Sequence, residues 1–336
     1  MHDPLLRVDN LTACLAIPGG DCAVVQDVSF DLEPGKVLCL VGESGCGKSV
    51  TARAILRLLD PPLRAAPGSS ILFGGRDLSA LPEREMRALR GSDIAMIFQE
   101  PMSSLNPVKR VGDQVAEALI LHRGLSRRDA RDRAIMLFRQ VGIPVPERRV
   151  RQFPHELSGG VQQRAMIAMA LACDPKILIA DEPTTALDAT IQAQILDLLR
   201  DLRDTRDMGI LLITHDLGVV AEMADDIAVM YAGRIVERGS VEQVLTSPQH
   251  PYTEQLLRSV PRLRMPRDQR LAVIGGTVPS PLQRQPGCGF APRCTLAFDR
   301  CRTAPAPPLF GATPHLAACW LCDDGPRATR GVREAA

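Results

Sequence analysis

The feature that most constrains the fold of this chain is the octapeptide GESGCGKS at residues 42–49, which matches the pattern G-x-x-x-x-G-K-[ST]. An apolar run of strand length, 37–41, precedes it, and apolar residues at helical spacing follow it over 50–59. In such a strand–loop–helix context the glycines let backbone N–H groups surround a phosphate, and the helix N-terminus adds partial positive charge. The octapeptide therefore predicts a phosphate-binding loop (P-loop).

The chemistry of the loop assigns a role to two of its side chains. Lys48 can reach the β- and γ-phosphates of a nucleotide, and the hydroxyl of Ser49 can ligate Mg²⁺. Cys46 occupies a free position, where we expect a small filler, although a reactive thiol is conceivable. The residues expected to contact the nucleotide here are Gly42, Ser44, Gly45, Cys46, Gly47, Lys48, Ser49 and Val50.

Two further apolar strands end in residues suited to nucleotide hydrolysis. The run KILIADEP ends at Asp181 and Glu182, as expected for a buried strand of a parallel sheet. Asp181 would hold Mg²⁺, and Glu182 would polarise the attacking water as general base. The run GILLITHD ends near His215, whose imidazole could contact the γ-phosphate. Together with the P-loop these residues predict an enzyme that hydrolyses a nucleotide.

Composition narrows the remaining possibilities. The formal net charge is +1 and aromatic residues make up 3%, so the chain lacks both a bulk field for nucleic acid and aromatic platforms for stacking bases. The first sixteen residues do not read as a signal peptide, and the apolar runs are too short to span a bilayer. We therefore expect a cytoplasmic protein with reduced thiols.

Six motifs in a fixed order resemble the ATP-binding subunits of ABC transporters. The stretch LSGGVQQR (157–164) is similar to the family signature, Gln99 to the Q-loop residue, Asp188 to the end of the D-loop and His215 to the switch histidine, beside the P-loop and the Asp181 strand. The resemblance implies a P-loop α/β fold with a mixed-sheet core and an inserted helical subdomain. It also implies that Gln99 acts in catalysis and in binding Mg²⁺.

The signature implies a second nucleotide contact. A Ser followed by two glycines at a helix start makes an anion site with free N–H groups. In the family this site serves the nucleotide of a partner subunit, so two ATPase subunits would form a head-to-tail sandwich. The residues assigned to it are Ser158, Gly159 and Gly160, and Gln163 and Asp188 are further expected nucleotide-binding residues.

Longer stretches, such as IFQEPMSSLNPV and HPYTEQLLRSVP, resemble the ATPase subunits of oligopeptide and dipeptide importers. The implied function is ATP hydrolysis that energises import of di- or oligopeptides, with nickel or glutathione as alternative solutes. The implied partners are a second, homologous ATPase subunit, two transmembrane permease subunits and an extracytoplasmic solute-binding protein, with no nucleic acid. The implied location is the cytoplasmic face of the inner membrane. The alternative from another class is a soluble ABC ATPase acting on ribosomes or DNA.

The same resemblance predicts two domains. Residues 1–260 would form the ATP-binding domain, with a helical subdomain over about 100–158, and residues 261–336 a Cys-rich extension. The patterns DQVAEALILHR and RRDARDRAIMLFRQV predict helices in the subdomain. The interleaved Asp129 and Asp132 favour a solvated helix face over a basic patch for nucleic acid.

Five of the ten cysteines fall between Cys288 and Cys322. In a reducing compartment such a cluster favours a metal site over disulfides. Four of them, separated by five, six and seventeen residues, lack the C-x₂₋₄-C spacing of zinc sites but suit a 4Fe–4S cluster, and they match a pattern in some peptide-importer ATPases. Zinc through the CWLC pair and a metal-free or disulfide-linked tail stay open. The predicted cluster ligands are Cys288, Cys294, Cys301 and Cys319.

Overall fold

The computed structural model describes residues 3–100, 104–185, 188–259, 274–325 and 327. The described residues divide into two compact units. The helical unit comprises the described residues of Met1–Leu5, Leu32–Lys36 and Ala80–Ile213, and the P-loop unit those of Leu6–Asp31, Val37–Ser79 and Thr214–Ala336. We call residues 274–325 the cysteine tail.

The sheet of the helical unit is parallel and buried. Strand β8 (Ile177–Asp181) lies between β7 (Ile94–Ile97) and β9 (Gly209–Thr214), and both pairings are parallel. All residues of β8 and β9 are buried, which explains why they read as continuous apolar runs rather than as alternating ones. The strand predicted before Asp181 is thereby confirmed.

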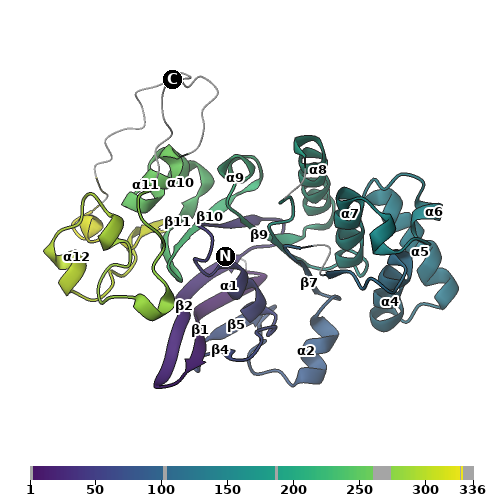
Figure 1. The fold of residues 1–336 in the computed structure, drawn as a ribbon, viewed down its shortest axis with the longest axis horizontal. Helices are drawn as coiled ribbons and strands as arrows, with labels where there is room; N and C mark the ends of the chain where they lie inside the picture. The colour runs from purple at the N-terminus through teal and green to yellow at the C-terminus, as the bar shows by residue number, and fades with distance from the viewer. Residues whose placement is uncertain (1–2, 101–103, 186–187, 260–273, 326, 328–336) are drawn as a thin grey trace. The chain divides into compact units, whose positions relative to one another are not determined.

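The helices of this unit gather beside the sheet, and α4, α5 and α7 pack on one another (Figure 1). The Oγ of Ser126 caps α5 by accepting a hydrogen bond from the backbone N of Asp129 at 3.2 Å. Asp129 and Asp132 are exposed, so the predicted solvated helix face is confirmed. The helices are α2 (Glu83–Leu89), α4 (Val111–Arg123), α5 (Arg127–Gln140), α6 (Pro146–Arg149), η1 (Pro154–Glu156), α7 (Gly159–Ala170) and α8 (Ala189–Arg206).

The P-loop unit contains two sheets. In the first, the strand order is β2-β1-β5-β6, with β4 also paired to β1. Burial alternates along much of β1, as expected for a strand with one face on a core. The strands are β1 (Leu6–Ile17), β2 (Gly20–Leu32), β4 (Leu63–Ala65), β5 (Ser70–Phe73) and β6 (Arg76–Asp77).

The second sheet of this unit links the P-loop strand to the cysteine tail. Along the order β12-β13-β11-β10-β3, the β10–β3 pair is parallel and the other pairs are antiparallel. The turn between β10 and β11 is formed by Ala232 and Gly233, which confirms the predicted hairpin. The strands are β3 (Val37–Val41), β10 (Asp226–Tyr231), β11 (Arg234–Ser240), β12 (Phe310–Ala312) and β13 (His315–Ala317).

Short helices complete the P-loop unit. Helix α1 contacts β1, α9 contacts β3, and α10 contacts both α9 and β11. Most helices of the tail are single turns, because this Pro-rich segment offers few runs that can continue a helix. The helices are α1 (Lys48–Ile55), α9 (Leu217–Met223), α10 (Val241–Thr246), α11 (Pro251–Arg258), η2 (Pro281–Gln283), η3 (Ala291–Arg293), α12 (Asp299–Thr303) and η4 (Trp320–Cys322).

A fully buried carboxylate joins the tail to this sheet. Glu237 of β11 accepts hydrogen bonds from the backbone N of Gln249 at 2.6 Å and of His250 at 2.9 Å. Its Oε1 also lies 2.8 Å from Nε2 of His315 on β13. These contacts satisfy a charge that would otherwise be costly to bury, and they fix the entry into α11 and the tail strand together.

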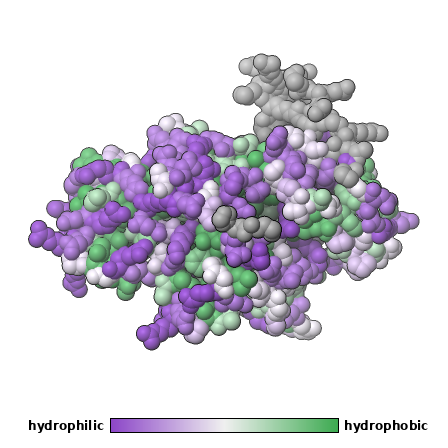
Figure 2. All heavy atoms as spheres, turned by 180° about the vertical axis from the view of Figure 1, so that it is seen from behind, coloured by the Kyte–Doolittle hydropathy of each residue, from purple (hydrophilic) through white to green (hydrophobic). Residues whose placement is uncertain are grey.

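The surface carries a mixture of residue types. On the face drawn in Figure 2, hydrophilic residues surround scattered hydrophobic ones. Among the described residues, no helix has both the length and the apolar character needed to cross a membrane.

We predict that Glu237→Ala lowers the thermal unfolding temperature by several degrees. The substitution leaves two buried backbone N–H groups without their acceptor, at a cost of about 2–3 kcal/mol. Differential scanning calorimetry of the purified chain measures the change. Glu242→Ala, on an exposed position of α10, is the matched control and should leave the temperature unchanged. Equal unfolding temperatures for Glu237→Ala and the wild type would contradict the assignment.

Candidate functional site

The P-loop lies between β3 and α1, as the sequence predicts. The Nζ of Lys48 donates to the carbonyl oxygens of Gly42 at 2.8 Å and of Glu43 at 3.1 Å, so the amine is held inside the loop. Gly42 has a φ of +151°, and a Cβ there would lie 2.2 Å from the carbonyl oxygen of Met230. A side chain at this position would displace the loop, and glycine is therefore required.

The free thiol of the loop is a packing group. Cys46 is buried and lies 3.7 Å from Nζ of Lys48. Burial raises the pKa of Cys46, although the neighbouring Lys48 lowers it in part. The thiol is protonated near neutral pH, which agrees with its interpretation as a filler and not with a reactive nucleophile.

In the helical unit, the two predicted carboxylates stand at the carboxyl end of β8. Asp181 is the last residue of the strand and is 1% exposed. Glu182 follows with a φ of +49°, a left-handed conformation that is uncommon for a residue with a side chain. Its backbone N donates to the carbonyl of Ile213 at 2.9 Å, which holds this conformation in place.

The carboxylate of Glu182 is oriented by two donors. Nε2 of Gln99 lies 3.1 Å from Oε2 of Glu182, and Oγ1 of Thr185 lies 3.0 Å from the same oxygen. The two donors fix the orientation of the carboxylate, the kind of group that acts as general base toward water. The structure therefore brings together Gln99 and Glu182, which the resemblance alone had associated, and adds Thr185, which the sequence analysis missed.

The signature stretch also forms a helix start, as predicted. Ser158 is the N-cap of α7 in extended conformation, and Gly159 and Gly160 form its first turn. Nε2 of Gln163 donates to the carbonyl of Pro183 at 2.5 Å, so α7 is connected to the turn that carries Glu182.

Two more predicted residues lie at helix starts. The side chain of Asp188 caps α8 by accepting from the backbone N of Ile191 at 2.9 Å. The rest of the predicted D-loop, Ala186 and Leu187, lies outside the described residues. In the P-loop unit, His215 is exposed directly after β9, and Asp216 beside it caps α9 by accepting from the backbone N of Gly218 at 2.8 Å.

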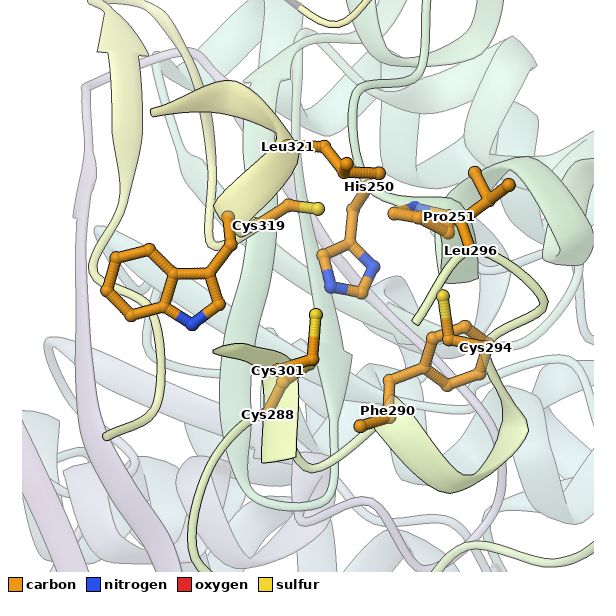
Figure 3. Close-up of a pocket in the computed structure, with 11 residues that line it drawn as sticks. His250, Pro251, Cys288, Phe290, Cys294, Leu296, Cys301, Cys319 and Leu321 are labelled. Carbon is orange, nitrogen blue, oxygen red and sulfur yellow. The ribbon is translucent and has the colours of Figure 1, made fainter. Parts of the chain in front are cut away.

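The four predicted cluster ligands converge. Cys288, Cys294, Cys301 and Cys319 line one pocket of about 10 Å³, together with His250 and Phe290 (Figure 3). Cys288 precedes η3, Cys294 is the C-cap of η3, Cys301 lies in α12 and Cys319 precedes η4, so four separate segments of the cysteine tail surround the same space. The pocket is named the cysteine pocket. Four thiols around one apolar space are the donor set that a 4Fe–4S cluster uses.

Burial shifts the pKa values of the thiols and of the imidazole that line the cysteine pocket. Burial raises the pKa of Cys288 and of Cys294, and bound iron would reverse this effect by stabilising the thiolates. Burial lowers the pKa of His250 to about 4, so its ring is neutral at pH 7. Cys322, which the sequence analysis left outside the ligand set, shares a hydrogen bond with Cys319 that lowers the pKa of Cys322 to about 7.

The described residues do not support the metal prediction. All ten cysteines are free thiols, so the disulfide alternative has no counterpart in the structure. Within the described ranges, no group of three or more His, Cys, Asp or Glu side chains is arranged to hold a metal ion. The pocket as it stands has room for about one water molecule, and a cluster would need the thiols to move apart.

Sequence reasoning missed the surroundings of Glu43 in the P-loop. Its carboxylate forms an ion pair with Arg293 at 2.7 Å, and its backbone N donates to the hydroxyl of Tyr252 at 2.9 Å. Both partners lie more than 200 positions away in the chain. The stretch HPYTEQLLRSVP, which contains Tyr252, resembles peptide-importer subunits, but this resemblance does not indicate a contact with Glu43.

Two family profiles match the chain: residues 25–185 match "ABC transporter", and residues 236–301 match "Oligopeptide/dipeptide transporter, C-terminal region". The putative peptide import ATP-binding protein of Brucella abortus (strain 2308) is 50% identical over 324 residues, which cover 94% of this chain and 96% of that protein. The dipeptide transport ATP-binding protein DppD of Bacillus subtilis (strain 168) is 48% identical over 321 residues, or 96% of each chain.

Solved structures agree with the fold. The dimeric ATP-binding cassette MJ0796, bound to ADP and Pi, is 27% identical with a TM-score of 0.63, covering 70% of this chain and 98% of that one. The ABC transporter component cbiO1 of Clostridium perfringens is 26% identical with a TM-score of 0.60, covering 72% of this chain and 91% of that one. With the P-loop, the Glu182 site and the signature helix in the predicted order, the chain belongs to the ATP-binding subunits of ABC transporters.

Proposed function

We propose that this chain is the ATP-hydrolysing subunit of an ABC importer for di- or oligopeptides. Identity of about half over nearly the full length of peptide-import and dipeptide-transport subunits is the observation that carries the proposal. The match of 236–301 to the C-terminal region of oligopeptide/dipeptide transporters also favours this role over that of a ribosome- or DNA-associated ATPase. Nickel and glutathione stay as alternative solutes, because solute choice lies mainly in the partner proteins.

The proposed roles of the residues follow from their chemistry. Lys48 and the backbone N–H groups of the P-loop bind the phosphates, and Ser49 and Asp181, with Gln99, hold Mg²⁺. Glu182 accepts the proton of the attacking water, oriented by its bonds from Gln99 and Thr185. His215 contacts the γ-phosphate. Ser158, Gly159 and Gly160 serve the nucleotide of a second ATPase subunit, and Gln163 and Asp188 also bind nucleotide.

We propose that the chain acts at the cytoplasmic face of the inner membrane with a homologous ATPase subunit, two permease subunits and a solute-binding protein. The helical subdomain, about 100–158, would receive the permease. Val108, Leu121 and Val145 in this region are 79%, 73% and 62% exposed, so apolar side chains are accessible to a partner there. Residues 1–260 would form the ATP-binding domain and 261–336 the extension.

We also propose that Cys288, Cys294, Cys301 and Cys319 hold a 4Fe–4S cluster. Their convergence on the cysteine pocket supports this proposal. When bound, the cluster would supply four iron–thiolate bonds that cross-link loops from across the tail. These bonds would add to the contacts that hold this segment of roughly fifty residues, whose own core is small.

For catalysis, we predict that Glu182→Gln retains ATP binding but lowers turnover by about 10²–10⁴-fold, because the amide cannot accept the proton of water. ATPase assays of the purified complex, with nucleotide binding measured on the same sample, test this. Asp197→Asn makes the same carboxyl-to-amide change on an exposed position of α8 and should retain full turnover. Normal turnover in Glu182→Gln would overturn the assignment of the base.

For nucleotide binding, we predict that Lys48→Ala weakens ATP affinity by about ten- to a hundredfold and lowers turnover as well. Its ammonium is the charged donor of the loop, and a hydrogen bond to a charged group is worth about 1.5–3 kcal/mol. Equilibrium binding of a fluorescent ATP analogue measures the loss. Lys176→Ala, on the surface, is the control. Unchanged affinity in Lys48→Ala would refute the phosphate-site assignment.

For the tail, we predict that anaerobically purified protein has a broad visible absorbance and about four irons and four sulfides per chain. Cys294→Ser should abolish the colour, whereas Cys22→Ser, outside the pocket, should keep it. A colourless sample with one zinc per chain would show that the cysteines form a zinc site and not a 4Fe–4S cluster. A colourless sample free of both metals after anaerobic purification would refute any metal role.

A further inference from the structure

The P-loop carries an acidic side chain that a site for a polyanion must neutralise. Glu43 is the second residue of the loop, between Gly42 and Ser44. Its carboxylate meets the guanidinium of Arg293 in a two-pronged ion pair, with Nη1 at 2.7 Å from Oε2 and Nη2 at 2.9 Å from Oε1. The Arg293 side chain is 5% exposed and that of Glu43 28%, so solvent screens this pair less than it screens a fully exposed one.

Arg293 is itself fixed by the cysteine tail. Its Nε donates to the carbonyl of Gly275 at 2.7 Å, and Nη2 donates to the carbonyl of Ile274 at 3.2 Å. Its guanidinium also lies over the ring of Tyr231, 5.7 Å from the centroid. Every donor nitrogen of Arg293 is therefore engaged, and the group has one orientation, toward Glu43.

A second tail-side residue holds the backbone of the same loop residue. The hydroxyl of Tyr252, a fully buried side chain on α11, accepts the hydrogen bond from the Glu43 backbone N at 2.9 Å. Tyr252 packs in a cluster with Tyr231 and Phe290, with ring centroids 4.7 and 5.4 Å from its own. Glu43 is thus held by its side chain and its main chain at once.

Arg293 and Tyr252 both lie next to residues that line the cysteine pocket. Arg293 is followed by Cys294, and Phe290 of the aromatic cluster lines the pocket (Figure 3). Tyr252 lies two residues after His250, whose Nδ1 accepts the backbone N–H of Tyr252 at 3.1 Å and whose ring also lines the pocket. A shift of the pocket walls would therefore move both contacts to Glu43.

From this geometry we propose that Arg293 of the cysteine tail and Tyr252 of α11 are positioning residues of the ATP site: they hold Glu43, and so set the conformation and charge of the P-loop. This inference rests on the proposed ATP binding at the loop. Lys48 already donates to the Glu43 carbonyl, so a displaced Glu43 changes the cradle around the phosphates. Without Arg293, the carboxylate of Glu43 repels the nucleotide and weakens its binding.

The test is a double-mutant cycle in the purified full chain, read by equilibrium binding of a fluorescent ATP analogue and by KM against kcat in the full transporter. Arg293→Met should raise the dissociation constant and KM about three- to tenfold, with kcat changed less. Glu43→Gln in the same chain should restore most of the affinity, because no uncompensated carboxylate remains. Tyr252→Phe should weaken binding about threefold without any charge change.

A control variant tests whether the loss of any Arg–carboxylate pair in the tail weakens nucleotide binding. Arg300→Met removes another Arg–carboxylate pair of the tail, with Asp323, and should leave nucleotide affinity unchanged. Unchanged affinity in Arg293→Met, or a double variant as weak as or weaker than Arg293→Met alone, would overturn the inference. Lys48→Ala in the same assay distinguishes a failure of this inference from a failure of the ATP-site assignment. If Lys48→Ala loses binding and Arg293→Met does not, the inference fails and the ATP site stands.

Discussion

The close packing of the P-loop against the β10–β11 hairpin is the constraint on which the P-loop unit depends. A Cβ at Gly42 would lie 2.2 Å from the carbonyl oxygen of Met230, and the backbone N of Gly233 donates to the carbonyl of Cys46 at 2.8 Å. The loop therefore takes its shape from the hairpin as much as from its own sequence. The hairpin also carries β13 and Glu237, so the element that shapes the phosphate cradle is the one that anchors the cysteine tail.

Much of this fold could be predicted, because the relevant signals are local. The apolar run 37–41 forms β3 with the expected bounds, and the glycine turn at 233 joins two strands as the pattern indicates. The helix after the P-loop begins at Lys48 and ends at Ile55, several residues short of the apolar pattern that predicted it. Periodicity reports which face is buried, and it does not report where a chain leaves the helix to pack elsewhere.

The candidate sites were predictable as residue types and less so as contacts. The strand before Asp181 and Glu182 placed the carboxylates, but the positive φ of Glu182 and its bond from Thr185 have no sequence signal. Neither does the pairing of Glu43 with Arg293, since 250 positions separate them. The four cysteines were identified from spacing and resemblance, whereas His250 as a wall of their pocket was not, because the long connection from α11 to η3 hides their proximity.

The cysteine tail is held by contacts with the rest of the P-loop unit, and one of these contacts reaches the P-loop. Its own apolar core is small, with Ala317, Cys319 and Cys322 packed against Phe310, and cannot by itself offset the entropy of ordering the segment. Two carboxylates of the P-loop unit therefore hold it, Glu237 at β13 and Glu43 at Arg293. A carboxylate in a phosphate loop weakens the binding of a polyanion unless a cation accompanies it. Because the tail supplies that cation, a change in the cysteine pocket that displaces Arg293 would alter the charge of the P-loop as well as its shape.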